Sequence, residues 1–229
     1  MDEHWQALTG QHNPALVATD PAGRFLVHRD MLPAWQSLVD AAAAAGFGLS
    51  IASAYRSFER QNLIWQGKAT GKRAVLDSDG GVLDTRQLTE DELLFAMLRW
   101  SAIPGCSRHH WGSDVDVYDS RAVPADYAVQ LTAAESSGAG PFAALHDWLD
   151  RQLAQPGAFF FRPYARDRGG IAPERWHLSF APVASQYDAL LDESRLADWI
   201  ATQDIALKAA IRRHWPDIFH RYIRVSSPA

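Results

Sequence analysis

The sequence has 229 residues, of which 47% are hydrophobic and 21% are charged, so we expect a compact globular protein with a sizeable core and not a disordered chain. Its formal net charge is −5, which disfavours binding to nucleic-acid phosphates, and no nucleic-acid partner is expected. The single cysteine, Cys106, excludes an internal disulfide and a zinc site built from cysteines.

No segment of the sequence has the pattern of a membrane span or a signal peptide. Residues 1–10 (MDEHWQALTG) are acidic and polar, and the longest uncharged stretch, residues 41–55, is short and interrupted by glycine and serine. We therefore expect no membrane span. The chain as written indicates a cytoplasmic location, or a periplasmic or cell-wall location if a leader has been removed.

The first predicted elements are a helix, a strand and a second helix. Apolar residues at helical spacing predict a helix over residues 32–45, which ends at a glycine. Residues 47–53 (FGLSIAS) are typical of a short strand. Ser57 is a favourable N-cap for a helix that runs to Gly67. Residues 68–88 have several glycines and few large apolar side chains, which predicts a loop.

The middle of the chain is predicted to contain two helices and three strands. Thr89 and Glu92 have the spacing of a capping box, which predicts a helix over residues 90–101. Pro141 suits the first position of a helix that runs to about Leu153. The strand candidates alternate at period two or are rich in aromatic residues: 113–118 (SDVDVY), 159–164 (FFFRPY) and 176–180 (WHLSF).

The last part of the chain is predicted to be helical from Pro182 to about Ile223, with a break at Pro216. Strands and helices therefore occur in a mixed order, with helices alone at the end. This pattern predicts the α+β fold class, in which helices pack around a small sheet and a helical C-terminal part follows.

Three segments combine reactive side chains with turns and strands: 53–61 (SAYRSFERQ), 104–117 (PGCSRHHWGSDVDV) and 173–178 (PERWHL). In the second segment, Asp114 and Asp116 are two residues apart and project from one face of the predicted strand. Two carboxylates on a sheet face that is not solvated need a compensating charge, and a divalent metal ion can supply it.

Two histidines could complete such a metal site. His109 lies in a turn before the strand, His177 lies on a later strand, and Glu174 precedes His177 by three residues. Two imidazoles and one carboxylate with an open fourth position suit catalytic zinc, and a further carboxylate could accept a proton from water. Taken alone, each histidine is better explained as a hydrogen-bonded structural side chain, because these spacings also arise by chance.

The combination of motifs is more specific than any one of them. The pattern SxHxxGxxxD at residues 107–116, with ExWH at residues 174–177, resembles the paired signatures of the zinc D-alanyl-D-alanine carboxypeptidases. The resemblance is to the VanY-type branch, which is related to the VanX dipeptidases. SAYRS at residues 53–57, followed by Gln61, resembles the upstream segment of the same family, and the likeness covers about residues 26–180.

The resemblance implies a role for each matching residue. His109, Asp116 and His177 would bind one Zn²⁺ ion per chain, and Glu174 would be the base that activates water and later protonates the leaving amine. Arg56 would stabilise the oxyanion that forms at the scissile carbonyl. The residues expected to contact the substrate are Tyr55, Gln61, Ser107, Asp114 and Trp176.

The resemblance also implies a fold and an activity. An antiparallel sheet would carry the zinc ligands in a peptidase domain of residues 26–181, between an N-terminal segment (1–25) and a helical C-terminal extension (182–229) packed on the same domain. The activity would be removal of the C-terminal D-Ala from peptidoglycan stem peptides, with the stem peptide or its fragments as partner. Four alternative functions stay open: an L,D-carboxypeptidase, a D,D-dipeptidase, a peptidoglycan endopeptidase with the same site, or a non-catalytic zinc-containing peptidoglycan-binding module.

Some residues carry alternatives of their own. The family usually has Ala where this chain has Asp114, which could hydrogen-bond a ligand histidine, contact a cationic group of the substrate or lie solvated at the rim. Cys106 is three residues from His109, but nothing nearby indicates a lowered thiol pKa, so we interpret it as a small turn residue and not a nucleophile. His110 is interpreted as a hydrogen-bonding residue at the rim, and Trp100 as a packing residue.

Overall fold

The structure, a computed structural model, describes residues 2–225. Within that range, its centre is a four-stranded antiparallel sheet whose spatial order is β3-β4-β6-β5. These strands are β3 (Leu49–Ser53), β4 (Asp114–Asp119), β5 (Phe160–Phe161) and β6 (His177–Phe180). A separate antiparallel pair consists of β1 (Leu16–Ala18) and β2 (Leu26–His28).

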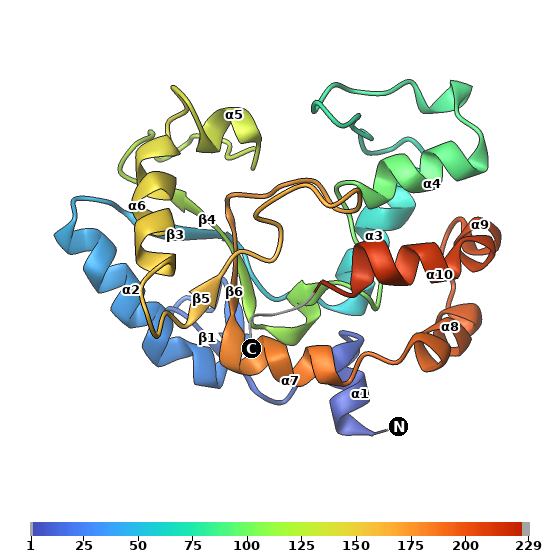
Figure 1. The fold of residues 1–229 in the computed structure, drawn as a ribbon, viewed down its shortest axis with the longest axis horizontal. Helices are drawn as coiled ribbons and strands as arrows, with labels where there is room; N and C mark the ends of the chain where they lie inside the picture. The colour runs from blue at the N-terminus through green and yellow to red at the C-terminus, as the bar shows by residue number, and fades with distance from the viewer. Residues whose placement is uncertain (1, 226–229) are drawn as a thin grey trace.

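Helices lie on both sides of the sheet in the view of Figure 1, with α2 and α6 to one side and α3, α4 and α8–α10 to the other. The α-helices are α1 (Glu3–Leu8), α2 (Leu32–Ala44), α3 (Phe58–Ala69), α4 (Glu90–Leu98), α5 (Ala133–Ser136), α6 (Ala143–Leu153), α7 (Ala181–Ala189), α8 (Glu193–Thr202), α9 (Lys208–Arg213) and α10 (Trp215–Ile218). Short turns of 3₁₀ or π helix span Arg29–Met31, Thr85–Gln87, Arg108–Trp111 and Phe219–Ile223. In the described part of the chain, no helix has the length and apolar character needed to cross a membrane.

The predicted α+β class, with its antiparallel sheet and helical C-terminal part, is confirmed. Two helix caps form as the sequence predicts. The Ser57 side chain accepts a hydrogen bond from the Arg60 backbone N–H at the start of α3, and Thr89 and Glu92 form a reciprocal capping box at the start of α4.

Several predicted boundaries are wrong for tertiary reasons. Helix α6 begins at Ala143, because the backbone N–H of Phe142 donates to Glu135 O at 2.8 Å, which leaves Pro141 outside the helix. Helix α4 ends at Leu98, three residues early, because Arg99 O accepts a hydrogen bond from Ala172 N instead of continuing the helix. The predicted strand 159–164 shortens to Phe160–Phe161, the only part that pairs with β6.

One hydrophobic core extends through the described residues. It contains Trp5 and Leu8 from α1, Val115 and Leu178 from the sheet, and Ile218 from the C-terminal helices. Residues on either side of the expected peptidase domain thus pack into the same core as the sheet. The domain boundaries after residues 25 and 181 stay a proposal based on the sequence.

Candidate metal centre and active site

The central strands have one apolar and one polar face. Strand β4 alternates so that Asp114 and Asp116 share a face, and the antiparallel register places Ser179 opposite Asp114 and His177 opposite Asp116. All four side chains are buried. A polar sheet face shielded from water needs internal partners for its charges. Asp114 and Asp116 have different kinds of partner.

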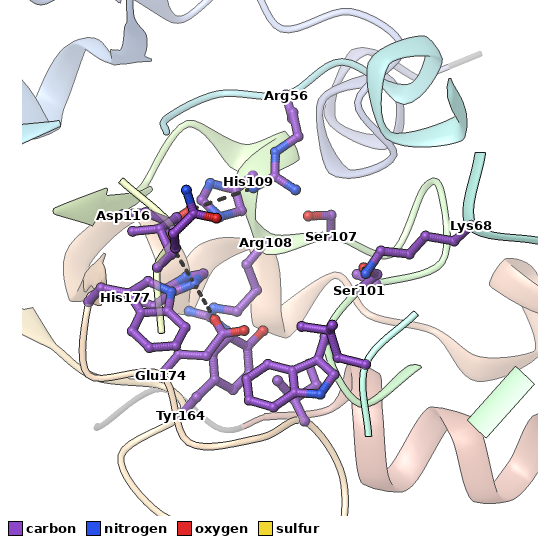
Figure 2. Close-up of a pocket in the computed structure, with 17 residues that line it drawn as sticks. Arg56, Lys68, Ser101, Ser107, Arg108, His109, Asp116, Tyr164, Glu174 and His177 are labelled. Atoms are coloured by element: carbon purple, nitrogen blue, oxygen red, sulfur yellow. Dashed lines mark hydrogen bonds and ion pairs between the residues drawn. The ribbon is translucent and has the colours of Figure 1, made fainter. Parts of the chain in front are cut away.

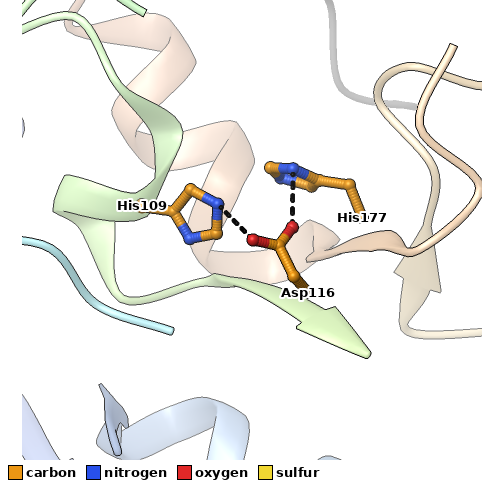
Figure 3. Close-up of side chains that lie close together, drawn as sticks. All are labelled: His109, Asp116 and His177. Carbon is orange, nitrogen blue, oxygen red and sulfur yellow. Dashed lines mark ion pairs between the residues drawn. The ribbon is translucent and has the colours of Figure 1, made fainter. Parts of the chain in front are cut away.

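His109 reaches this face from a tight turn. The Arg108–Trp111 turn ends at Gly112, whose φ of +72° lies in the left-handed region that favours glycine. A Cβ at this position would also lie 2.9 Å from the backbone nitrogen of His28. The motif glycine therefore permits both the turn and the close approach of β2. As a result, His109 Nε2 lies 3.3 Å from Asp116 Oδ2 (Figure 3).

His109, Asp116 and His177 have the geometry of a metal site. His177 Nδ1 lies 3.4 Å from Asp116 Oδ1, and one ligand atom from each residue falls within 4.8 Å of the others (Figure 3). Asp116 Oδ1 and His109 Nδ1 are buried and have no hydrogen-bond partner among residues 2–225. An unsatisfied buried carboxylate oxygen between two imidazoles fits a bound cation, and this donor set is that of a catalytic Zn²⁺ site.

The neighbours of Asp116 keep it ionised, as a metal ligand must be. Burial by itself would raise the pKa of this carboxyl group. The nearby His109, His177 and Arg56 outweigh burial and hold the pKa at about 2.

Asp114 fixes the orientation of the candidate metal ligand His177. His177 Nε2 donates to Asp114 Oδ1 at 2.9 Å, which leaves Nδ1 facing Asp116. Asp114 also accepts hydrogen bonds from Arg108 Nε at 3.0 Å and from Ser179 Oγ at 3.1 Å. Although burial opposes ionisation, the charges of Arg108 and His177 hold the pKa of Asp114 below its usual range.

The location of Asp114 corrects two of the alternatives for this residue. Its exposure is 0%, and it does not line the pocket beside the metal centre, so it is neither a solvated rim carboxylate nor positioned to contact a substrate. The hydrogen bond with the outer nitrogen of a ligand histidine is the alternative that the structure supports.

Glu174 is placed by a turn that directly precedes β6. The backbone N–H of His177 donates to Glu174 O at 3.2 Å, and the Glu174 carboxylate lies 3.2 Å from His177 Nδ1 (Figure 2). Burial raises the pKa of Glu174, and its hydrogen bond with His177 offsets only part of this effect. A carboxylate with raised proton affinity at the edge of a metal site suits a general base.

Arg56 lines the pocket beside His109, and Glu174 lies on the other side of the ligands in this view (Figure 2). Its Nη1 donates to Gln61 Oε1 at 2.9 Å, and its Nη2 donates to Ser53 Oγ at 3.1 Å and lies 3.6 Å from Asp116 Oδ2. These contacts hold the guanidinium group beside the metal centre, where it can stabilise a negative charge.

Gln61 and Tyr55, which the sequence suggested as substrate contacts, do not line the pocket. Gln61 is fully buried, and its amide donates to Ala102 O at 2.7 Å, so it positions Arg56. The Tyr55 hydroxyl lies 3.4 Å from Gly10 O and is absent from the pocket lining. Of the expected substrate contacts, Ser107 and Trp176 do line the pocket.

His110 and Cys106 are structural residues. His110 is fully buried, with Nδ1 donating to Arg56 O at 2.6 Å and Nε2 accepting from Gly105 N at 3.0 Å, so its expected position at the rim is wrong. Burial lowers the pKa of His110 to about 3, consistent with a neutral ring in both contacts. Burial raises the pKa of the Cys106 thiol far above its usual range, which argues against a nucleophilic thiolate.

The pocket has a volume of about 240 Å³ and contains residues that motif reasoning did not identify. Four of them are Lys68, Trp100, Ser101 and Tyr164. Trp100 is therefore a pocket residue and not only a packing residue. The sequence could have indicated Lys68 through its spacing from Gln61. Seven residues make two helical turns, so the two side chains lie on the same side of the helix.

Comparison with known sequences identifies the family. The sequence model of VanY D-alanyl-D-alanine carboxypeptidase matches residues 24–183, so the chain belongs to this family. An uncharacterized protein of Haemophilus influenzae is 40% identical over 100 residues, which are 43% of this chain and 68% of that protein. A D-alanyl-D-alanine carboxypeptidase of Enterococcus faecalis is 29% identical over 154 residues, which are 66% of this chain and 47% of that protein.

Solved structures with this fold include a mutant of the vancomycin-resistance D,D-pentapeptidase VanY in complex with Zn(II). It is 22% identical, with a TM-score of 0.53, over 88% of this chain and 91% of that one. The LD-carboxypeptidase LdcB is 20% identical, with a TM-score of 0.52, over 89% of this chain and 79% of that one. These likenesses show a shared fold. The family match and the ligand set identify the protein as a zinc metallopeptidase of the carboxypeptidase type.

Proposed function

We propose that the protein hydrolyses the C-terminal D-Ala residue from peptidoglycan stem peptides. The observation that carries this proposal is the arrangement of one pocket. Three metal-binding side chains, the carboxylate of Glu174 and the guanidinium group of Arg56 all line it. A purely structural metal site would need neither of the last two groups.

The residues divide the chemistry of hydrolysis between them. When bound by His109, Asp116 and His177, zinc would polarise the scissile carbonyl and lower the pKa of a water molecule. Glu174 takes the proton from the attacking water. The water oxygen bonds to the carbonyl carbon, and Arg56 stabilises the negative charge that develops on the carbonyl oxygen.

Glu174 then completes the reaction. As the carbon–nitrogen bond breaks, Glu174 delivers the proton to the leaving nitrogen, which departs as the amine of the released amino acid. The raised proton affinity of its buried carboxyl group supports both steps, because the group must first accept and then return a proton.

Product analysis tests the proposed bond specificity. Zinc-loaded protein is incubated with stem tri-, tetra- and pentapeptides and with cross-linked stem peptides, and the products are identified by mass spectrometry. Release of one D-Ala from the pentapeptide supports the proposal. Release of a dipeptide would indicate a D,D-dipeptidase, cleavage of the tetrapeptide an L,D-carboxypeptidase, and cleavage within cross-linked peptides an endopeptidase.

The variant Glu174→Gln tests the assignment of the base. It should lower kcat/KM by roughly 10²- to 10⁴-fold, because the amide cannot accept the proton, while the zinc content stays that of the wild type. Hydrolysis that persists in this variant would contradict the role of Glu174. Absence of hydrolysis in the wild type would favour a peptidoglycan-binding module.

A further inference from the structure

Lys68 and Ser101 form a polar pair on the pocket wall. Lys68 Nζ donates to Ser101 Oγ at 2.7 Å, and both residues line the same pocket as the metal ligands. In Figure 2 the pair stands across the pocket from His109, Asp116 and His177, and Ser107 lies between the two groups. The pocket therefore has a metal end and an ammonium end.

Helix α3 explains the position of the ammonium group. Gln61 and Lys68 lie on the same side of α3, two turns apart. Gln61 donates to Ala102 O, and Lys68 reaches the adjacent Ser101. Two residues on one face of α3 therefore serve the same pocket: Gln61 contacts Arg56, and Lys68 lines the pocket itself.

The charges in the pocket distinguish Lys68 from the two arginines that also line it. Arg56 lies 3.6 Å from Asp116, and Arg108 lies 3.0 Å from Asp114. For Lys68 Nζ, the described residues offer no carboxylate within ion-pair distance, and the bond to Ser101 uses only one of its three N–H donors. A partly buried ammonium group without a counter-charge favours an anionic ligand.

We propose that Lys68, assisted by Ser101, binds the C-terminal carboxylate of the substrate and so selects peptides with a free C-terminus over internal peptide bonds. This inference rests on the proposed function, since it places the released residue between the metal end and Lys68. It assigns the recognition of the carboxylate to Lys68, which lies two helical turns beyond Gln61 on α3 and was not among the substrate contacts expected from the sequence.

The test compares two substrates that differ only at the C-terminus. The kcat/KM values of a stem peptide with a free carboxylate and of its C-terminal amide are measured for the wild type, Lys68→Met and Ser101→Ala. Lys68→Met should lower kcat/KM for the acid by roughly 10- to 100-fold, mainly through KM, and change the amide little. The control Lys72→Met removes an exposed lysine outside the pocket and should behave as wild type.

Two kinetic results would overturn the inference. One is an unchanged preference for the acid over the amide in Lys68→Met, and the other is an equal loss with both substrates. A third substrate is amidated at a side-chain carboxylate instead. If the effect of Lys68→Met disappears with that substrate, the ammonium group binds a side-chain carboxylate, and the assignment to the C-terminus is wrong.

A binding measurement separates this inference from the proposed function. Calorimetry with zinc-loaded protein compares the dipeptide D-Ala-D-Ala with its amide, and it needs no hydrolysis. Tighter binding of the acid by the wild type, lost in Lys68→Met, supports the carboxylate site even if no stem peptide is cleaved. Equal binding of the acid and the amide, or binding of neither, overturns it.

Discussion

Two buried carboxylates, two residues apart on β4, behave differently. Asp114 accepts hydrogen bonds from His177, Arg108 and Ser179, and a permanent cation of the chain lies against it. Asp116 lies between two imidazoles and keeps an oxygen without a hydrogen-bond partner in the described part of the chain. We call the end of the polar face around Asp114 the closed end, because the chain itself supplies its counter-charge. We call the end around Asp116 the open end, because one carboxylate oxygen there has no hydrogen-bond partner in the described residues.

The difference shows how one strand can carry both a metal ligand and its support. A buried carboxylate needs a counter-charge, and the chain supplies Arg108 to Asp114. The open end suits a cation from outside the chain. Because His177 contacts both carboxylates, the closed end orients a ligand of the open end.

The strongest test removes the charge at the open end. Asp116→Asn keeps the size of the side chain but takes away an anionic ligand, so we expect no measurable hydrolysis. Its zinc affinity should fall further than the roughly 10- to 100-fold loss typical of residues behind the ligands. A competition titration with a chromophoric chelator measures the affinity. The matched control is Asp114→Asn. If Asp116→Asn and Asp114→Asn had equal zinc affinities, the distinction between the two ends would be removed.

The next test removes the built-in cation. Arg108→Met leaves Asp114 buried without its counter-charge, so the free energy of unfolding should fall by about 3–5 kcal/mol, as measured by urea denaturation. The matched control is Arg213→Met, which breaks exposed ion pairs with Glu90 and Asp91 and should cost about 0–1 kcal/mol. Equal effects of the two variants would show that the closed end needs no cation.

Removal of the closed carboxylate should affect the metal. Asp114→Ala frees the outer nitrogen of His177, so zinc affinity should fall roughly 10- to 100-fold. The double variant with Arg108→Met should lose less stability than the sum of the two single variants, because the two charges are in contact. Additive losses of stability would contradict the pairing of Asp114 with Arg108. An unchanged zinc affinity in Asp114→Ala would contradict the proposed support of His177.

The smallest effect is expected at Ser179. Ser179→Ala removes a hydrogen bond to Asp114 and one from Arg108, but it leaves the charge pair intact. We expect a loss of about 0.5–1.5 kcal/mol in the free energy of unfolding and a zinc affinity within a few-fold of the wild type. A loss as large as that of Arg108→Met would mean that hydrogen bonding, and not charge, stabilises the closed end.

The sequence predicts most of the elements that depend on local signals. Ser57, Thr89 and Glu92 cap helices as expected, because a cap involves only residues within one turn. The start of α6 and the length of β5 were wrong, since backbone contacts with distant segments decide them. Local patterns fix what a short segment can form, and tertiary contacts decide where it ends.

The same limit applies to the site. The resemblance of the motifs to the VanY family predicted the set of His109, Asp116 and His177, and the register of β4 with β6 brings Asp116 and His177 together. Gln61 lies on the predicted helix, but its contacts with Arg56 and Ala102 were not predicted, because the direction of its amide depends on tertiary packing. Lys68 and Ser101 meet across 33 positions of sequence, and no local pattern predicts such a pair.

The bonds around Arg56 have a mechanical consequence. Its backbone N–H donates to His109 O at 3.1 Å, and its carbonyl accepts from His110. These two hydrogen bonds couple the segment that carries Arg56 to the Arg108–Trp111 turn. We therefore expect the two segments to move together when a bulky peptide enters. Adaptation to a bulkier substrate would instead come from the loop that contains Gln130 and Leu131, which also line the pocket. Substrate range would then evolve by loop changes, with the reacting groups left undisturbed.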